Sequence, residues 1–209
     1  MRNYDEIREF VEREIVPRYD DFDAGHGRDH VQTVMSQALK LAVFYPEVDT
    51  CILIVAAAYH DLGLAFGRER HHIHSARIVR EDERLRQWFN DDEIQSIADA
   101  AEDHRASSNH EPRTIYGRIV AEADRIIDGD TIVRRALQYG MKHEPGLDRE
   151  GQYRRLMEHM KEKYDVGGYL KLWIPHGDNA RRLQEFRQTL ADEKAFRRLF
   201  DTIFDSINH

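Results

Sequence analysis

The sequence predicts an all-α protein, and three observations support that prediction. Apolar residues recur at helical spacing along nearly the whole chain. Residues 49–60 are apolar on every side, which suits a buried helix or strand, but their alanines and the neighbouring helical patterns favour a helix. Proline, which interrupts helices, is scarce at five residues in 209. We therefore expect helices joined by loops.

The clearest helical patterns lie in the N-terminal half. Residues 3–16 carry apolar side chains at helical spacing, and Pro17 is expected to end that helix. A second helix starts near Asp29 with one apolar stripe and stops at Pro46. Asp91 is a candidate N-cap of a later helix. The further helices expected in this half cover residues 49–60, 71–88, 91–105 and 113–127.

The C-terminal part is more polar but still helical in pattern. Residues 148–164 form a polar helix with few apolar positions. Asp178 is a candidate cap of a final helical region, in which phenylalanines recur every fourth residue. No repeat or low-complexity linker divides the sequence. We expect a single domain over residues 1–209, with a core at about 20–130 and a C-terminal helical extension at about 131–209.

The composition favours a folded protein without a nucleic-acid or membrane partner. Hydrophobic residues make up 41% and charged residues 33% of the chain, as in soluble globular domains. The net charge of −8 argues against a nucleic-acid polymer but leaves room for a small phosphorylated substrate. No stretch approaches the roughly 18 apolar residues of a membrane span, and the N-terminus lacks a signal-like apolar segment. The single cysteine, Cys51, cannot form an internal disulfide, and a cytoplasmic location is expected.

The dipeptide His60-Asp61, at the end of the apolar segment, is the main indication of a functional site. A histidine and a carboxylate are costly to bury unpaired, and a divalent metal ion would satisfy both. His30 and Asp124, each in a helical segment, fit the same idea. Imidazole nitrogen and carboxylate oxygen suit Mn, Fe, Co, Ni, Zn and, less well, Mg.

The order His30, His60-Asp61 and Asp124 resembles the HD superfamily, a group of helical, metal-dependent phosphohydrolases. The resemblance implies that helices pack around a metal site formed by these four residues. The acidic general base of some nucleotidase relatives is absent downstream of His60-Asp61, and so is the Gly-Tyr-Pro signature of cyclic-dinucleotide phosphodiesterases. The subtype therefore stays open.

The resemblance also implies places for a second metal ion. Dinuclear members carry histidines at positions that match His71 and His104, and Asp61 would be able to bridge two ions. His72 or His74 could take the place of His71, because the segment is crowded with histidines. We expect one bound ion, with room for a second. The expected catalytic residues are His60, Asp61 and His104.

Four arginines are candidates for binding substrate phosphate. Arginine suits phosphate because its planar donors match the phosphate oxygens. Each candidate lies within a few residues of an expected metal ligand: Arg28, Arg68, Arg70 and Arg105. His26 could donate a proton to the leaving group or merely stabilise its own loop.

The expected function is hydrolysis of a phosphate ester or anhydride of a small metabolite, such as a nucleotide, by metal-activated water. The chain has no nucleophile motif and no Gly-x-x-x-x-Gly-Lys phosphate loop, so the metal would carry the chemistry. Two alternatives stay open: a diiron oxygenase of the HD type, and a non-catalytic metal or nucleotide sensor. The last helices could cover the mouth of the pocket or form the contact of a homodimer.

Overall fold

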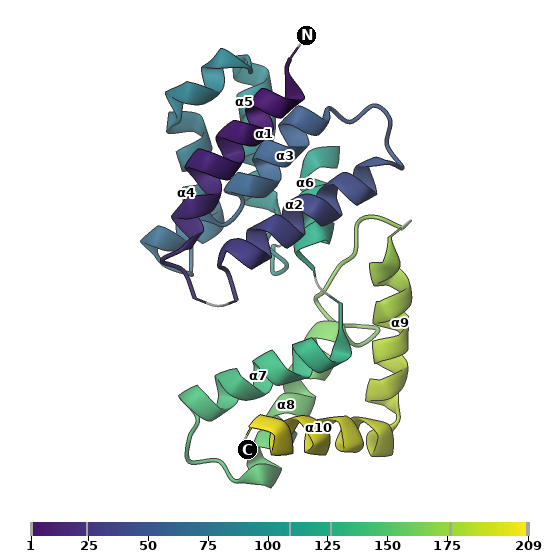
Figure 1. The fold of residues 1–209 in the computed structure, drawn as a ribbon. Helices are drawn as coiled ribbons and strands as arrows, with labels where there is room; N and C mark the ends of the chain where they lie inside the picture. Colours follow the sequence, from purple (N-terminus) through teal and green to yellow (C-terminus); the bar gives the residue numbers. More distant parts are fainter. Residues whose placement is uncertain (1, 24, 109, 126, 176, 208–209) are drawn as a thin grey trace. The chain divides into compact units, whose positions relative to one another are not determined.

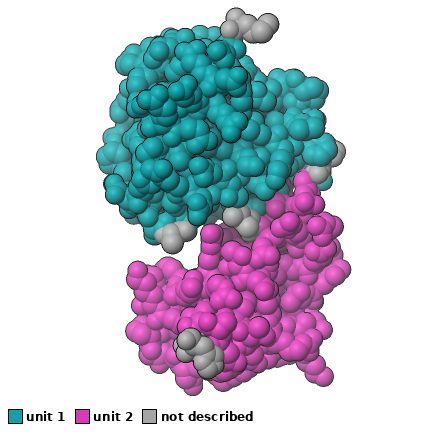
Figure 2. Space-filling view, viewed as in Figure 1, with its two compact units in different colours: residues 1–125, 173–176 teal, residues 126–172, 177–209 magenta. Residues whose placement is uncertain are grey.

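The computed structural model describes residues 2–23, 25–108, 110–125, 127–175 and 177–207. These residues form ten α-helices, several shorter helical segments and connecting loops, with no strand among them (Figure 1). The predicted all-α fold is confirmed. The chain divides into two compact units (Figure 2): unit 1 contains residues 1–125 and 173–176, and unit 2 contains residues 126–172 and 177–209. The expected single-domain organisation stays a prediction.

Unit 1 is built around one helix, α3, in which every residue from Cys51 to Tyr59 is buried. Helices α2, α5 and α6 all pack against α3. The bounds of the unit 1 elements are α1 Tyr4–Phe10, η1 Val11–Ile15, η2 Val16–Tyr19, α2 Arg28–Ala42, α3 Thr50–Tyr59, η3 Leu62–Phe66, α4 His71–Glu81, η4 Glu83–Gln87, α5 Asp91–Asp103 and α6 Ile115–Asp124. The all-round apolar character of α3 follows from this central position, because it has neighbours on every side.

Three predicted boundaries in unit 1 were wrong. The first helix does not end at Pro17 but continues through the π-helical η1 into the 3₁₀-helical η2, where Pro17 stands in the first turn and needs no N–H partner. The expected helix 71–88 breaks at Asp82, whose extended backbone and side chain cap η4 instead. The N-cap of α5 is Asn90 rather than Asp91, because Asn90 and Glu93 form a reciprocal capping box.

Unit 2 consists of α7 Gly129–His143, α8 Arg149–Tyr164, α9 Asp178–Ala191 and α10 Glu193–Ile207. Helix α7 was not predicted; Asp128 caps it, and its buried side chains include Ile132 and Leu137. Gly177, not Asp178, occupies the N-cap position of α9. The final helical region splits into two helices at Asp192, whose side chain accepts hydrogen bonds from the backbone N–H groups of Lys194 and Ala195.

The described residues contain no single helix that is both long enough and apolar enough to cross a membrane. Within the described part of the chain, one pair of helical segments, residues 50–66 and 71–81, meets the length and composition criteria when taken together, with a bend of 117° between its parts.

Candidate metal centre

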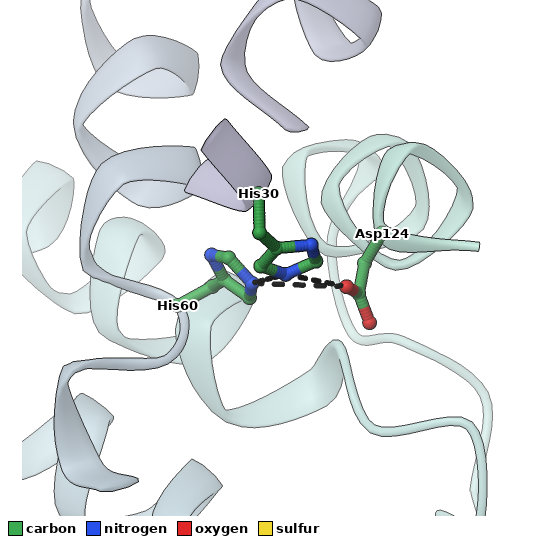
Figure 3. Close-up of side chains that lie close together, drawn as sticks. All are labelled: His30, His60 and Asp124. Atoms are coloured by element: carbon green, nitrogen blue, oxygen red, sulfur yellow. Dashed lines mark hydrogen bonds and ion pairs between the residues drawn. The ribbon is translucent and has the colours of Figure 1, made fainter. Parts of the chain in front are cut away.

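Three histidine and aspartate side chains converge where α2, α3 and α6 meet. His30 lies in the first turn of α2, His60 follows the last residue of α3, and Asp124 is the last residue of α6. Their ligand-type atoms all lie within 4.8 Å of one another (Figure 3). His30 Nε2 is 3.3 Å from His60 Nε2 and 3.2 Å from Asp124 Oδ1. We refer to His30, His60 and Asp124 as group 1.

A second set of ligand-type side chains lies beside the first. Asp61, His71 and His104 also bring one ligand atom each to within 4.8 Å of the others, and we refer to them as group 2. His71 begins α4 and His104 follows α5, so different helices supply them. The two ring nitrogens His71 Nε2 and His104 Nε2 are 3.1 Å apart. The structure therefore brings together all six residues that the sequence analysis named as metal ligands.

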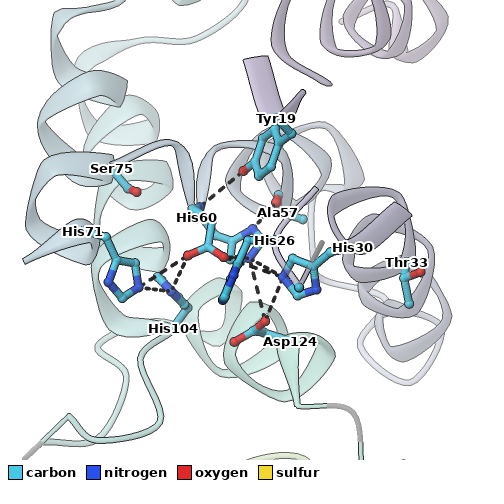
Figure 4. A network of polar contacts seen from close by, with 12 residues as sticks. Tyr19, His26, His30, Thr33, Ala57, His60, His71, Ser75, His104 and Asp124 are labelled. Atoms are coloured by element: carbon cyan, nitrogen blue, oxygen red, sulfur yellow. Dashed lines mark hydrogen bonds and ion pairs between the residues drawn. The ribbon is translucent and has the colours of Figure 1, made fainter. Parts of the chain in front are cut away.

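Figure 4 labels the four histidines of the two groups. Asp61 connects the two groups, because each of its carboxylate oxygens faces a different pair of these histidines. Oδ2 lies 3.6 Å from His30 Nε2 and 3.3 Å from His60 Nε2. Oδ1 lies 3.4 Å from His71 Nε2 and 3.3 Å from His104 Nε2. The side chain is almost fully buried. A carboxylate in this position is suited to contact two cations at once.

Backbone contacts fix the tautomer of three of the four histidines. The Nδ1 atoms of His60, His71 and His104 lie 2.6–2.8 Å from the carbonyl oxygens of Ala57, Arg68 and Ala101. A carbonyl only accepts hydrogen bonds, so each Nδ1 carries the hydrogen and a neutral ring presents a bare Nε2 lone pair. Lone pairs that face each other at 3.1 Å, as in His71 and His104, repel unless a proton or a metal ion lies between them. The donor set therefore fits a divalent metal ion.

Burial and the neighbouring charges shift the pKa values of the site in different directions. Burial disfavours charged His30, but hydrogen bonds to Asp124 and Asp61 outweigh it and raise the pKa of His30 to about 9. Burial and the neighbouring His104 lower the pKa of His71 to about 4. Although burial acts in the opposite direction, the surrounding histidines hold the pKa of the Asp61 carboxyl far below its usual range. Asp61 therefore stays ionised, His30 favours its charged form and His71 favours its neutral form.

Tyr19 and Gly63 support the centre without belonging to the ligand set. The fully buried Tyr19 hydroxyl donates to the Ala58 carbonyl at 2.8 Å and accepts from the Asp61 N–H at 3.3 Å. A Cβ atom on Gly63 would lie 1.9 Å from the His71 carbonyl oxygen, so only glycine lets α4 approach this closely. The sequence analysis missed both residues, because neither has a ligand-type side chain.

In the described part of the chain, the guanidinium groups of the four arginines proposed for substrate binding make no hydrogen bond or ion pair with groups 1 and 2; the contact of Arg68 with His71 is through its backbone carbonyl. Arg28 is exposed and forms an ion pair with Asp20. Arg105 donates to the Glu69 carbonyl at 2.7 Å. Arg68 and Arg70 are exposed in the loop that precedes α4. Their roles in binding stay predictions.

Comparison with known proteins agrees with this geometry. The family model of the HD domain matches residues 27–127. Over these residues the chain belongs to the HD domain family. The matched segment of this HD protein contains all of groups 1 and 2.

One solved structure is similar to the chain. The crystal structure of a predicted HD superfamily hydrolase from an uncultured Thermotogales bacterium is 22% identical, and the similarity covers 75% of this chain and 90% of that one with a TM-score of 0.48. No curated protein matches the HD protein described here. Family membership and the ligand geometry together support a metal-dependent hydrolase in general terms.

Proposed function

We propose that this HD protein is a metal-dependent phosphohydrolase that acts on a small phosphorylated metabolite, such as a nucleotide. The observation that carries the proposal is the position of Asp61, whose two oxygens face two separate histidine pairs. Phosphoryl transfer benefits from cations about 3.5–4 Å apart, which contact both the attacking and the leaving oxygen. A shared carboxylate between two ligand groups is compatible with that spacing.

Each of the two groups would hold its own metal ion. Group 1 with Asp61 would hold one ion, and group 2 would hold a second. Bound divalent ions lower the pKa of water and neutralise phosphoryl oxygens, which supplies an attacking hydroxide near neutral pH. Among the expected catalytic residues, His60 and His104 present Nε2 from fixed rings, and the buried Asp61 keeps its carboxylate between them.

Substrate phosphate needs cationic partners besides the metal. We assign this role first to Arg68 and Arg70, whose guanidinium groups are exposed in the loop between η3 and α4. Arg28 and Arg105 are the second choice for phosphate binding, since each already has a partner outside the centre. A guanidinium that is exposed in the free protein can reorient toward a phosphate with little cost.

Metal content and phosphate release test the proposal together. Protein purified without chelator should contain one to two equivalents of a divalent first-row metal by plasma mass spectrometry, and Asp61→Asn should lose most of it. Asp178→Asn, at an exposed aspartate in unit 2, is the matched control and should retain wild-type content. Phosphate release from a panel of nucleotides and sugar phosphates should require the metal. A wild-type protein that holds no metal after soaking would contradict the proposal.

A second candidate function is oxidation by a diiron centre. The observation that favours it is the same set of six ligands in two groups, because oxygen chemistry also uses paired metal ions. Under this alternative the protein would retain two irons, and turnover would stop under nitrogen. Phosphate release that is unchanged without oxygen would exclude the oxygenase, and saturable nucleotide binding without any product would instead indicate a sensor.

A further inference from the structure

His26 lies beside the metal centre but belongs to neither ligand group. It stands in the loop before α2, and its ring lies edge-on to the His30 ring with 5.8 Å between the centroids (Figure 4). Its side chain is 22% exposed, so it is accessible from solvent while it borders the buried site. A polar ring in this position can meet a molecule that approaches the metal ligands from outside.

Asp23 fixes the orientation of the His26 ring. His26 Nδ1 lies 2.8 Å from Asp23 Oδ1, and the same oxygen accepts the backbone N–H of Gly25 at 2.8 Å. Although burial acts in the opposite direction, the hydrogen bond from His26 lowers the pKa of the Asp23 carboxyl, and nearby Arg68 acts in the same sense. Asp23 therefore stays ionised, accepts the Nδ1 hydrogen and leaves Nε2 as the ring nitrogen that is available.

We propose that His26 contacts the phosphate of the substrate directly through Nε2, with Asp23 as the positioning residue. This inference rests on the proposed phosphohydrolase function. It gives His26 a role in substrate binding rather than in metal binding. Arg68, another candidate for binding phosphate, lies close enough to Asp23 to influence its charge. The alternative is that His26 and Asp23 only stabilise the loop that leads into α2.

The chemistry of the pair suits an anionic ligand. A ring that donates from both nitrogens is stabilised when it lies between a carboxylate on one side and a phosphate oxygen on the other. Hydrogen bonds that involve charged groups are roughly twice as strong as neutral ones. Removal of the Nε2 contact should therefore weaken phosphate binding about tenfold or more.

Two substitutions at His26 separate the two roles. Asparagine reaches the position of Nδ1 and can still donate to Asp23, but it has no atom at the position of Nε2. Glutamine places its amide near the position of Nε2 and gives up the Nδ1 contact. If His26 binds phosphate, His26→Asn should lose affinity and His26→Gln should retain part of it. If His26 only stabilises the loop, the order of the two variants should be reversed.

The experiment measures the affinity of metal-loaded protein for inorganic phosphate by isothermal titration calorimetry. We expect His26→Asn to bind phosphate about tenfold more weakly or worse, with unchanged metal content and an unchanged unfolding midpoint. Asp23→Asn should show a smaller loss. His143→Asn, at an exposed histidine in unit 2, is the control and should match wild type.

The outcomes distinguish this inference from the function on which it rests. Wild-type phosphate affinity in His26→Asn, in a protein that still hydrolyses phosphate esters, would overturn the role of His26 alone. Loss of metal from His26→Asn would also overturn it, because the residue would then act through the ligands. A wild-type protein that neither binds phosphate nor releases it from any ester would overturn the proposed function and this inference with it.

Discussion

Removal of a single oxygen atom, in the substitution Tyr19→Phe, tests how the His60-Asp61 pair is held in place. The Tyr19 hydroxyl bridges the Ala58 carbonyl and the Asp61 N–H, at 2.8 and 3.3 Å. The side chain has no solvent exposure, and burial raises the pKa of its hydroxyl well above its usual value, so it acts as a neutral hydrogen-bonding group. Phenylalanine keeps the ring and removes only these two contacts.

The size of the effect follows from the groups that are left without partners. The ring of Phe fills nearly the same volume, so no large cavity forms. The Ala58 carbonyl loses the hydroxyl donor, and the Asp61 N–H loses its acceptor. A buried polar group without a partner costs about 1–3 kcal/mol, so we expect the free energy of unfolding of unit 1 to fall by about that amount. Metal affinity should fall about tenfold or more, because loss of an outer hydrogen bond to a ligand commonly has that effect.

Urea unfolding with and without added metal measures both quantities. The variant Tyr139→Phe removes a hydroxyl from a residue that is 59% exposed, and it should behave as wild type. Metal affinity comes from competition with a chromophoric chelator. If Tyr19→Phe unfolds at the wild-type urea concentration and holds metal equally well, the hydroxyl does not position Asp61, and the argument from this contact fails.

Three further predictions concern packing, metal and pH. Gly63→Ala should lower the free energy of unfolding by about 1–3 kcal/mol and reduce the metal content, because its Cβ would lie 1.9 Å from the His71 carbonyl oxygen; a variant with full metal content and wild-type unfolding would contradict this. Dialysis against chelator should lower the unfolding midpoint, and added metal should restore it. At a metal concentration a hundredfold above the Kd, the free energy of unfolding should rise by about 2.7 kcal/mol. Equal midpoints with and without metal would refute a metal site in the folded state. Although burial acts in the opposite direction, hydrogen bonds from Arg84 and Tyr59 lower the pKa of Asp82. The ionised carboxylate therefore stabilises the fold at pH values above its unfolded pKa of about 3.9. This contribution is lost as the pH falls through the lower pKa of the folded state. Asp82→Asn should therefore be less stable than wild type at pH 7 and nearly equal to it near pH 2 in denaturant titrations, and a difference that does not depend on pH would count against the pairing.

The sequence was sufficient to predict those helices whose pattern of apolar residues is unambiguous. Helix α3 was predicted because its apolar residues leave no polar face, and that pattern reflects its central position. Helix α7 was missed, although its buried Val133 and Leu137 lie four residues apart, because charged residues separate them. The capping partners of η4 and α5 depend on side-chain hydrogen bonds that involve Asp82 and Asn90, and such choices between neighbouring polar residues are not visible in spacing.

For the site, the resemblance to the HD superfamily implied both the residues and their division into a first and a second ion site, but not the geometry between them. The His60-Asp61 pair stood out at the end of an apolar segment, whereas His71 and His104 were named from the positions of ligands in dinuclear members of the HD superfamily. Which of them face one another depends on ring orientation and on how helices that are distant in sequence pack. Asp61 shows this most clearly: the resemblance implied that it could bridge two ions, and the structure adds which of its oxygens faces which histidine pair. The contribution of Tyr19 depends on the same kind of long-range contact.

The histidines that follow α3 and α5 show why this fold favours a cation at this place. The last carbonyl groups of a helix have no partner within the helix, and they carry the negative end of its dipole. His60 and His104 occupy the C-cap positions of α3 and α5, and each directs Nδ1 to the carbonyl three residues earlier, in Ala57 and Ala101. One contact thus satisfies a helix carbonyl, fixes the ring and turns Nε2 toward the centre. Helix α6 ends at Asp124, so the negative ends of three helices lie next to the ligands, and a divalent ion there would be stabilised by the helices as well as by the side chains.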